Sequence, residues 1–304
     1  MENTIFFGNS FNLVSPEAKT WNELLSEIAN NSDDVIKDIP NTLQYEDLYL
    51  ARKIDLSKLP ESKILHSEEF QIKYRISELV SSFSFNELHE ILASLNSHSY
   101  ITTNYDHTFE DKLIESGLLE KPEKSDTSEQ LYSVRRVHSY YDSKTDSITK
   151  VWPIHGEYKH PKSIMLGYDH YCGSIGKIDS YIKGRYSKYG VKIPGIIDRL
   201  KSKDTNIHSW IDLFFMNNIH IIGFGLDYSE LDIWWLLNKR MRFIHDGETV
   251  IQNKITIYGC DDCLDKQKAK LLDSFGVQAV ILPKPESDWF AVNKELLAML
   301  KDNL

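Results

Sequence analysis

The stretch SYITTNYDHTFEDKLIESG, residues 99–117, joins an apolar run to a helical pattern through a short polar turn. Its first residues, Ser99–Thr103, are the β-branched and aromatic types found in strands that are covered on both faces. Gly117 stands where the C-cap of the following helix is expected. The apolar face of that helix consists of Phe109, Leu113 and Ile114. The stretch therefore predicts one strand–turn–helix unit of an α/β fold.

Four other apolar runs have the same character, and most are followed by a helical pattern. They are Thr4–Phe7, Ile219–Phe224, Ile255–Gly259 and Val277–Leu282. Strands that alternate with helices predict parallel strands joined by crossovers. We therefore expect a doubly wound, parallel, Rossmann-like α/β sheet.

Capping patterns indicate where the helices begin and end. Thr20 and Glu23 have capping-box spacing, and Ser229 and Asp232 stand at capping positions of a second helix. After the run that ends at Gly259, an apolar face closed by Gly276 is expected from Leu264, Leu271 and Phe275. These patterns place one helix after each of the corresponding strands.

Two segments interrupt the alternation of strands and helices. Residues from about 31 to 96 have mostly helical patterns and predict a helical insertion. Residues from about 120 to 215 are mixed, with a hairpin expected around DSKTDS (residues 142–147) and helical or looped structure beyond it. We expect residues 1–304 to form a single domain that carries both segments.

The composition is that of a soluble globular protein, with 41% apolar and 26% charged residues. The net charge of −10 argues against a general electrostatic grip on nucleic acid. No signal-peptide pattern or membrane-spanning run is present, so we expect a cytoplasmic protein without a membrane partner. The cysteines Cys172, Cys260 and Cys263 do not make a disulfide framework, and a single C-x-x-C pair does not complete a zinc site. No metal is expected.

Polar and glycine residues gather where the predicted strands end. In a sheet of this kind ligands bind outside the carboxyl ends of the strands, so these residues are the candidate site. Glycines let a phosphate or ribose approach the backbone, and helix N-termini behind them attract anions. The candidates are Gly8, Asn9, Ser10, Asn104, Asp106, His155, Gly156, Gly223, Gly225 and Gly259.

Each candidate also has an ordinary structural interpretation. Residues 8–10 can be a simple turn, and Asn104 and Asp106 can be a turn residue and a helix cap. His155 is one of 11 histidines. The GFG at residues 223–225 falls short of a G-x-G-x-x-G fingerprint because residue 228 is Tyr.

Four motifs occur in an order that resembles the sirtuin superfamily. They are GNS (8–10), TTNYD (102–106), IHG (154–156) and GFGLDYSELDIWWLL (223–237). The resemblance covers nearly the whole chain and is closest to the bacterial sirtuin-like NAD-cleaving domains of anti-phage defence. It implies a bacterial cytoplasmic enzyme with a sirtuin-like fold and NAD as its substrate.

The resemblance also implies a role for individual residues. Asn104 matches the residue that positions water and ribose, Asp106 the acid that holds the nicotinamide carboxamide, and His155 the catalytic base beside Gly156. The first phosphate loop matches at Gly8 and Ser10, with Asn9 between them, and the second at Gly223 and Gly225. Two departures stand out: Phe6 replaces a glycine of the first loop, and the paired cysteines of zinc-containing protein deacylases are absent, which argues against an acyl-lysine substrate.

These residue types suit glycosidic cleavage of NAD. Nicotinamide leaves readily once the ribosyl carbon gains positive charge, so the enzyme must chiefly hold the substrate and deliver a nucleophile. An amide both donates and accepts hydrogen bonds, and an imidazole takes a proton near neutral pH. Backbone N–H groups hold phosphates without lysine, so an acidic protein can bind NAD.

We therefore expect an NAD⁺ hydrolase that releases nicotinamide and ADP-ribose, regulated as an abortive-infection effector. A homo-oligomer or a separate sensor protein is the expected partner. Three alternatives remain open: an NAD-dependent deacylase or ADP-ribosyltransferase, a non-catalytic module that binds NAD or ADP-ribose, and a component that acts only through partners.

Overall fold

The computed structural model describes residues 1–57, 60–64, 66–121, 131–188, 190–261, 264–283 and 288–304. Within these residues one sheet has eight strands in the order β10-β9-β8-β1-β2-β5-β4-β3. The strands are β1 (Asn3–Phe7), β2 (Ser99–Thr102), β3 (Leu119–Lys121), β4 (His138–Asp142), β5 (Ser147–Pro153), β8 (Asn218–Ile222), β9 (Ile255–Cys260) and β10 (Val277–Leu282). Neighbouring strands from β10 to β5 are parallel, which confirms the predicted sheet, and β4 and β3 continue it antiparallel.

The direction of winding reverses beside β1, at the centre of the sheet. The chain places β2 and β5 on one side of β1, and β8, β9 and β10 on the other. The carboxyl ends of β1 and β8 therefore form the switch point where open α/β sheets bind ligands.

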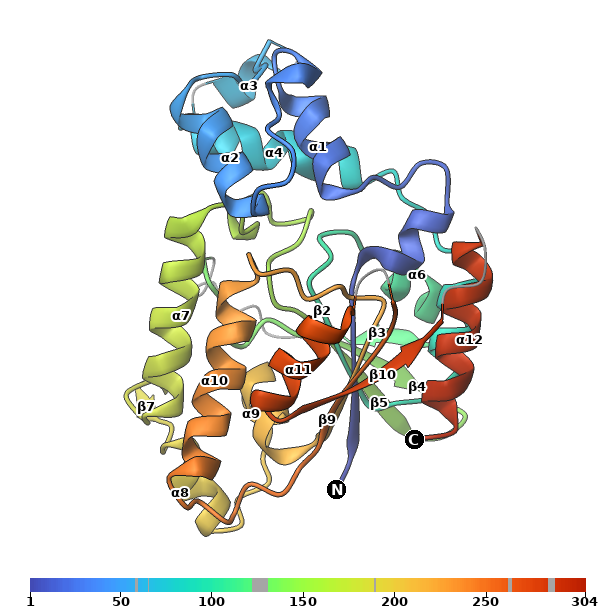
Figure 1. Cartoon of the computed structure of the whole chain (residues 1–304), viewed down its shortest axis with the longest axis vertical. Coiled ribbons are helices and arrows are strands. Elements are labelled where there is room, and N and C mark those ends of the chain that lie inside the picture. Colours follow the sequence, from blue (N-terminus) through green and yellow to red (C-terminus); the bar gives the residue numbers. More distant parts are fainter. Residues whose placement is uncertain (58–59, 65, 122–130, 189, 262–263, 284–287) are drawn as a thin grey trace.

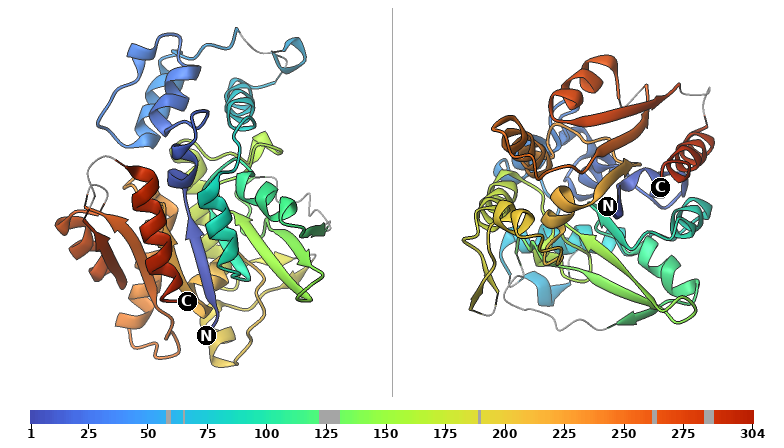
Figure 2. Two further views of the ribbon diagram at one scale, coloured as in Figure 1. Left: turned by 90° about the vertical axis from the view of Figure 1, so that its right-hand side faces the viewer. Right: turned by 90° about the horizontal axis from the view of Figure 1, so that it is seen from below.

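Helices cover both faces of the sheet, as Figures 1 and 2 show. One face packs against α5 (Glu87–Ser94), α6 (Thr108–Glu115) and α12 (Trp289–Lys301). The other packs against α7 (Tyr168–Ile182), α8 (Ile196–Lys201), α9 (Trp210–Met216), α10 (Leu231–His245) and α11 (Lys266–Ser274). Alternation along β1 explains the layering, because Ile5 and Phe7 enter the first core and Phe6 enters the second.

Four helices form a lobe beyond the carboxyl ends of the parallel strands, at the top of Figure 1. They are α1 (Trp21–Ile28), α2 (Asn41–Leu50), α3 (Glu61–Ile64) and α4 (Glu68–Val80). The lobe has its own apolar core, which includes Leu25, Leu48 and Ile72 together with Ile164 and Leu166 from the chain after β5. This shared core joins the lobe to the sheet. Short 3₁₀ helices occur at Asn9–Val14, Ser32–Asp34 and Pro161–Ser163.

Several local predictions are confirmed. The capping box of α1 is present, with Glu23 N–H donating to the Thr20 side chain and Thr20 N–H donating to the Glu23 carboxylate. The hairpin around residues 142–147 is β4–β5. Beyond the hairpin lie α7, α8 and a short ribbon of β6 (Ser187–Lys188) and β7 (Val191–Lys192). The ribbon was not predicted.

Three local predictions are wrong. The strand expected to end at Phe224 ends at Ile222, because Gly223 turns the chain with a φ of +61°. Ile114 is exposed, so the buried face of α6 is formed by Phe109 and Leu113 without it. In α11 the buried residue is Leu272, since Leu271 faces outward.

Within the described residues, no helix is both long and apolar enough to cross a membrane. Cys172 is exposed and Cys260 is buried, and neither forms a disulfide. Cys263, the other member of the C-x-x-C pair, lies outside the described residues.

Candidate active site

A cavity of about 760 Å³ lies between the helical lobe and the carboxyl ends of the strands. Its volume is within the range of small-molecule and cofactor sites. The lobe contributes apolar side chains such as Trp21, Leu24 and Phe83 to the wall. Eight of the ten predicted site residues line it: Asn9, Ser10, Asn104, Asp106, His155, Gly223, Gly225 and Gly259. Gly8 and Gly156 adjoin these lining residues in the chain.

The switch point is built by a close approach of the chain after β1 to the chain after β8. The Ser10 N–H donates to the Gly223 carbonyl over 3.1 Å. A Cβ at Gly8 would lie 2.9 Å from that same carbonyl oxygen, so a larger residue would push the two segments apart. Phe6, which replaces a glycine of the sirtuin pattern, is fully buried beneath them, with its ring 4.8 Å from that of Phe224.

The remaining glycines have different local roles. Gly225 has open space where a Cβ would be, and its carbonyl accepts a hydrogen bond from Lys268 Nζ over 2.7 Å. A Cβ at Gly259 would meet the Leu264 side chain at 2.5 Å. Gly156 has a φ of +97°, and a Cβ there would lie 2.3 Å from the Ser163 carbonyl oxygen. The turn after β5 therefore requires glycine at residue 156.

The polar residues after β1 are held by neighbours from distant parts of the chain. Ser10 Oγ donates to Asn293 Oδ1 of α12 over 2.9 Å, and Asn9 Nδ2 donates to the Lys19 carbonyl over 2.9 Å. These contacts fasten the first loop to α12 and to the entrance of the lobe.

Asn104 is buried at the end of β2, with its side chain directed across the switch point. Its Nδ2 donates to the Gly8 carbonyl over 3.3 Å, and its backbone N–H donates to Thr102 Oγ1 over 3.1 Å. The Asn104 side chain therefore links the chain after β2 to the chain after β1, and this contact fixes its orientation in the cavity wall.

Asp106 lines the cavity, but both of its carboxylate oxygens have protein partners. Oδ2 accepts from Asn12 Nδ2 over 2.8 Å, and Oδ1 accepts from Thr108 N–H over 3.1 Å and from Thr108 Oγ1 over 2.6 Å. Burial raises the pKa of Asp106, and these hydrogen bonds act in the opposite direction. The N-cap of α6 is His107 and not Asp106, although the Asp106 carboxylate accepts from the N–H of Thr108, the first residue of the helix.

His155 lies between two carboxylates at the start of α10. Its Nε2 is 3.2 Å from both oxygens of the fully buried Asp232, and its Nδ1 is 3.6 Å from Glu230 Oε2. Burial lowers the pKa of His155, but the charge and hydrogen bond of Asp232 and the charge of Glu230 outweigh it, so the pKa lies above its ordinary value. Two carboxylates therefore orient the ring and increase its basicity.

Glu230 and Asp232 were not predicted as site residues. Burial raises the pKa of Glu230 to about 7, against the opposing charge of His155, and Tyr171 OH donates to its carboxylate over 3.1 Å. Asp232 accepts from Ser174 Oγ over 3.1 Å. The prediction that Ser229 and Asp232 cap the helix is wrong: α10 begins after Glu230, and Ser229 instead donates to Asp227 from both its N–H and its hydroxyl.

The sequence carried a signal for these acids, since SELD places Glu230 and Asp232 at the start of the helix that follows β8. Helix capping already explained an acid at this position, and only the folded chain brings His155 next to Glu230 and Asp232. Asn12, which donates to Asp106, was also not predicted as a site residue. It follows the GNS loop but gave no pattern of its own.

Comparisons with known proteins agree on one family. The model of a family described as SIR2-like domain matches residues 98–280, more than half of the chain. NAD(+) hydrolase ThsA of Bacillus cereus (strain MSX-D12) is 33% identical to this chain over 108 residues. That match covers 36% of this chain and 20% of the relative, so the chain spans only about a fifth of that protein's length. The family match includes Asn104, His155 and Asp232, whereas the loop at residues 8–10 lies outside it.

Proposed function

This chain belongs to the SIR2-like domain family, and from that premise we propose that it is an NAD⁺ hydrolase that releases nicotinamide and ADP-ribose. One observation carries the proposal: an Asn amide and a carboxylate-held imidazole, Asn104 and His155, line the same cavity beside the switch point. The similarity to a protein named as an NAD(+) hydrolase supports the same substrate.

The proposed reaction needs few protein groups. As the bond between the ribosyl carbon and nicotinamide breaks, its electron pair leaves with the positively charged pyridinium nitrogen, and nicotinamide departs neutral. Water adds to the ribosyl carbon and gives up a proton to His155, whose basicity Asp232 and Glu230 increase. Asn104 orients the water and the ribose through its amide.

The loops at the switch point complete the proposed substrate site. Backbone N–H groups in the turns after β1 and β8 hold the pyrophosphate, and Gly225 leaves room for it. In this proposal Asp106, which lines the cavity near the start of α6, contacts the carboxamide of nicotinamide. NAD is the proposed substrate and the sequence calls for no further cofactor.

The biological role follows from the resemblance in the sequence. We extend the proposal to a regulated anti-phage effector in the bacterial cytoplasm, which is silent until triggered and works as a homo-oligomer or with a separate sensor protein.

The experiment that tests the reaction class is incubation of the purified protein with NAD⁺ and no acceptor, with and without candidate activators. Chromatography should find nicotinamide and ADP-ribose in equal amounts. Turnover only when an acyl-lysine peptide or a protein acceptor is added would replace hydrolysis by deacylation or ADP-ribosyl transfer.

Binding without turnover in any condition would favour a nucleotide-binding module. In that case the variant His155→Ala should bind ADP-ribose as wild type does. His245→Ala is the control variant and should behave as wild type does, because the His245 side chain is 86% exposed. If ADP-ribose does not bind at all, the cavity is not a nucleotide site.

A further inference from the structure

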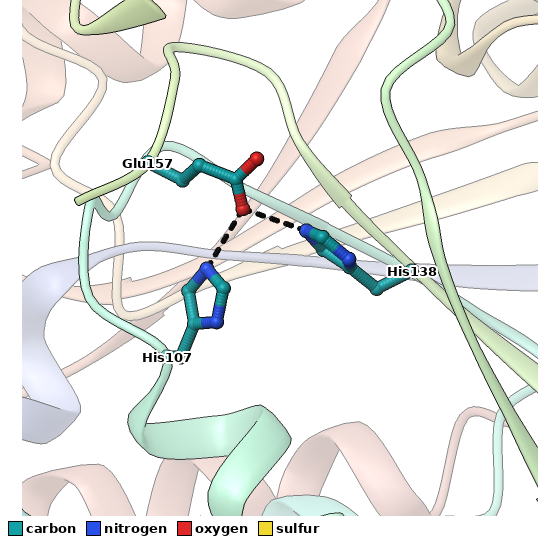
Figure 3. A group of neighbouring side chains, drawn as sticks. All are labelled: His107, His138 and Glu157. Atoms are coloured by element: carbon teal, nitrogen blue, oxygen red, sulfur yellow. Dashed lines mark hydrogen bonds and ion pairs between the residues drawn. The ribbon is translucent and has the colours of Figure 1, made fainter. Parts of the chain in front are cut away.

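Figure 3 shows a second cluster of titratable side chains, formed by His107, His138 and Glu157. His107 follows β2, His138 opens β4, and Glu157 follows β5, so three separate elements meet there. His107 Nε2 and His138 Nε2 lie 2.8 Å and 2.7 Å from the same atom, Glu157 Oε2. None of the three lines the cavity.

The donor set is that of a transition-metal site. Two imidazole nitrogens and one carboxylate oxygen, all within 4.8 Å of one another, suit Zn²⁺ and related divalent ions. Tetrahedral coordination at about 2.0–2.1 Å places ligand atoms about 3.3–3.4 Å apart, so both imidazole nitrogens need to move about 0.6 Å from Glu157 Oε2, a change within reach of small side-chain rotations. His107 and Glu157 are almost fully buried, whereas the His138 side chain is 20% exposed and gives an ion access from solvent.

The surroundings orient the carboxylate. Arg136 Nε lies 3.1 Å from Glu157 Oε1, so that oxygen is engaged and Oε2 alone is presented to the two imidazoles. Partners of this kind around the ligands are a regular feature of metal sites, where they fix ligand orientation.

An independent observation is the neighbouring Glu110. Its side chain is 2% exposed, and its Oε1 has no hydrogen-bond partner among the described residues. It stands one helical turn after His107 and within electrostatic reach of His107 and His138, and burial raises the pKa of its carboxyl against their charges. A buried carboxylate oxygen without a partner is costly unless a cation or water accompanies it.

We propose that His107, His138 and Glu157 bind a divalent transition-metal ion of the Zn²⁺ class, with Glu110 as a second negative charge beside it and water at the remaining positions. Both imidazoles then carry their proton on Nδ1 and present the Nε2 lone pair to the ion. The ion fastens the loop after β2 to the loop after β5. The site was not predicted from the sequence, because its three ligands are widely spaced along the chain.

The first experiment is titration of the chelator-treated protein with Co²⁺, followed by displacement with Zn²⁺. We expect one ion per chain and visible ligand-field absorption that Zn²⁺ abolishes. His138→Ala and Glu157→Gln should weaken Co²⁺ binding by about 100-fold or more, because each removes one of three protein ligands. The exposed His245→Ala should bind as wild type does. Zn²⁺ should raise the melting temperature of wild type and His245→Ala, but not of the two ligand variants.

Equal Co²⁺ binding by wild type and a folded His138→Ala or Glu157→Gln variant would overturn the proposal, as would no binding by wild type. If both ligand variants fail to fold, X-ray absorption of the Zn²⁺-loaded wild type decides. Two imidazole ligands and oxygen are expected, and a spectrum without imidazole ligands would contradict the site. None of these readouts uses NAD, so the result is independent of the proposed hydrolase activity.

Discussion

In the candidate site the fold holds the His155 imidazole between two carboxylates. Asp232 contacts its Nε2 with both carboxylate oxygens, and Glu230 stands at the other ring nitrogen. A carboxylate that accepts a hydrogen bond from an imidazole fixes the ring's orientation and stabilises the protonated form. The proposed base therefore depends on two acids, Glu230 just before α10 and Asp232 in its first turn.

Asp232→Asn tests this dependence. The amide keeps the size of Asp232 and can still accept the Ser174 hydroxyl, but it loses the charge that supports His155. On the proposed function we expect kcat for NAD hydrolysis to fall roughly 10²-fold, with little change in KM. Steady-state kinetics on variants checked by circular dichroism measure both constants. An unchanged kcat would mean that Asp232 serves only the packing of α10.

Glu230→Gln tests the raised pKa of Glu230. The folded chain holds this proton up to about pH 7, while the unfolded chain loses it near pH 4.5, so between these values the free energy of unfolding falls as pH rises. Gln cannot ionise, so wild type should lose stability relative to the variant across this window, by roughly 3 kcal/mol in total. Urea unfolding at a series of pH values measures the difference. A difference that does not vary with pH would contradict the assigned shift.

At the scale of the element, the turn after β5 is the most exacting segment. It carries His155 into the cavity and Glu157 away from it within three residues, and Gly156 makes the change of direction with its positive φ. Ser163 closes the turn by donating from Oγ to the His160 carbonyl and accepting from the Glu157 N–H.

Gly156→Ala should be among the most destabilising single substitutions in the described part of the chain. Its Cβ would meet the Ser163 backbone at 2.3 Å, and the positive φ adds strain, so we expect a loss of about 3 kcal/mol or more in the free energy of unfolding. Gly117→Ala is the matched control, because Gly117 has the same φ of +97° with nothing within 4 Å of its added Cβ. It should cost about 1 kcal/mol. Equal losses, measured by chemical denaturation, would show that contact with Ser163 is unimportant.

The sequence predicted the parallel strands and most strand-following helices, because buried parallel strands leave continuous apolar runs such as Ile255–Cys260. It failed at Asp232 because capping and site roles share one residue type near a helix start. Asp232 turns inward to His155 and Ser174 while one of its oxygens still accepts from the Ile233 N–H. Local pattern cannot resolve that competition.

At the scale of the whole molecule, the candidate site is an interface between the helical lobe and the sheet. The sequence predicted a helical insertion at about residues 31–96 but not that helices before and within it, α1, α2 and α4, would form one wall of the cavity. The cluster of His107, His138 and Glu157 was not predicted from the sequence either, since only tertiary folding brings these residues together.

This arrangement predicts how a ligand affects the backbone. Because the cavity is lined by both parts, binding of ADP-ribose should slow hydrogen exchange in α1 and α4 as well as in the loops after β1, β2 and β8. Hydrogen-exchange mass spectrometry with and without ADP-ribose measures this. Protection confined to the sheet side would mean that the lobe does not take part in binding.

The most direct measurement of the central claim is the rate of nicotinamide release by wild type, Asn104→Ala and His155→Ala, alongside ADP-ribose affinity. If the two side chains carry the reaction in one cavity, each variant should lose about 10²-fold or more of the rate while remaining folded, and His155→Ala should keep an ADP-ribose affinity close to that of wild type. Release at the wild-type rate by both variants would show that Asn104 and His155 do not carry the reaction.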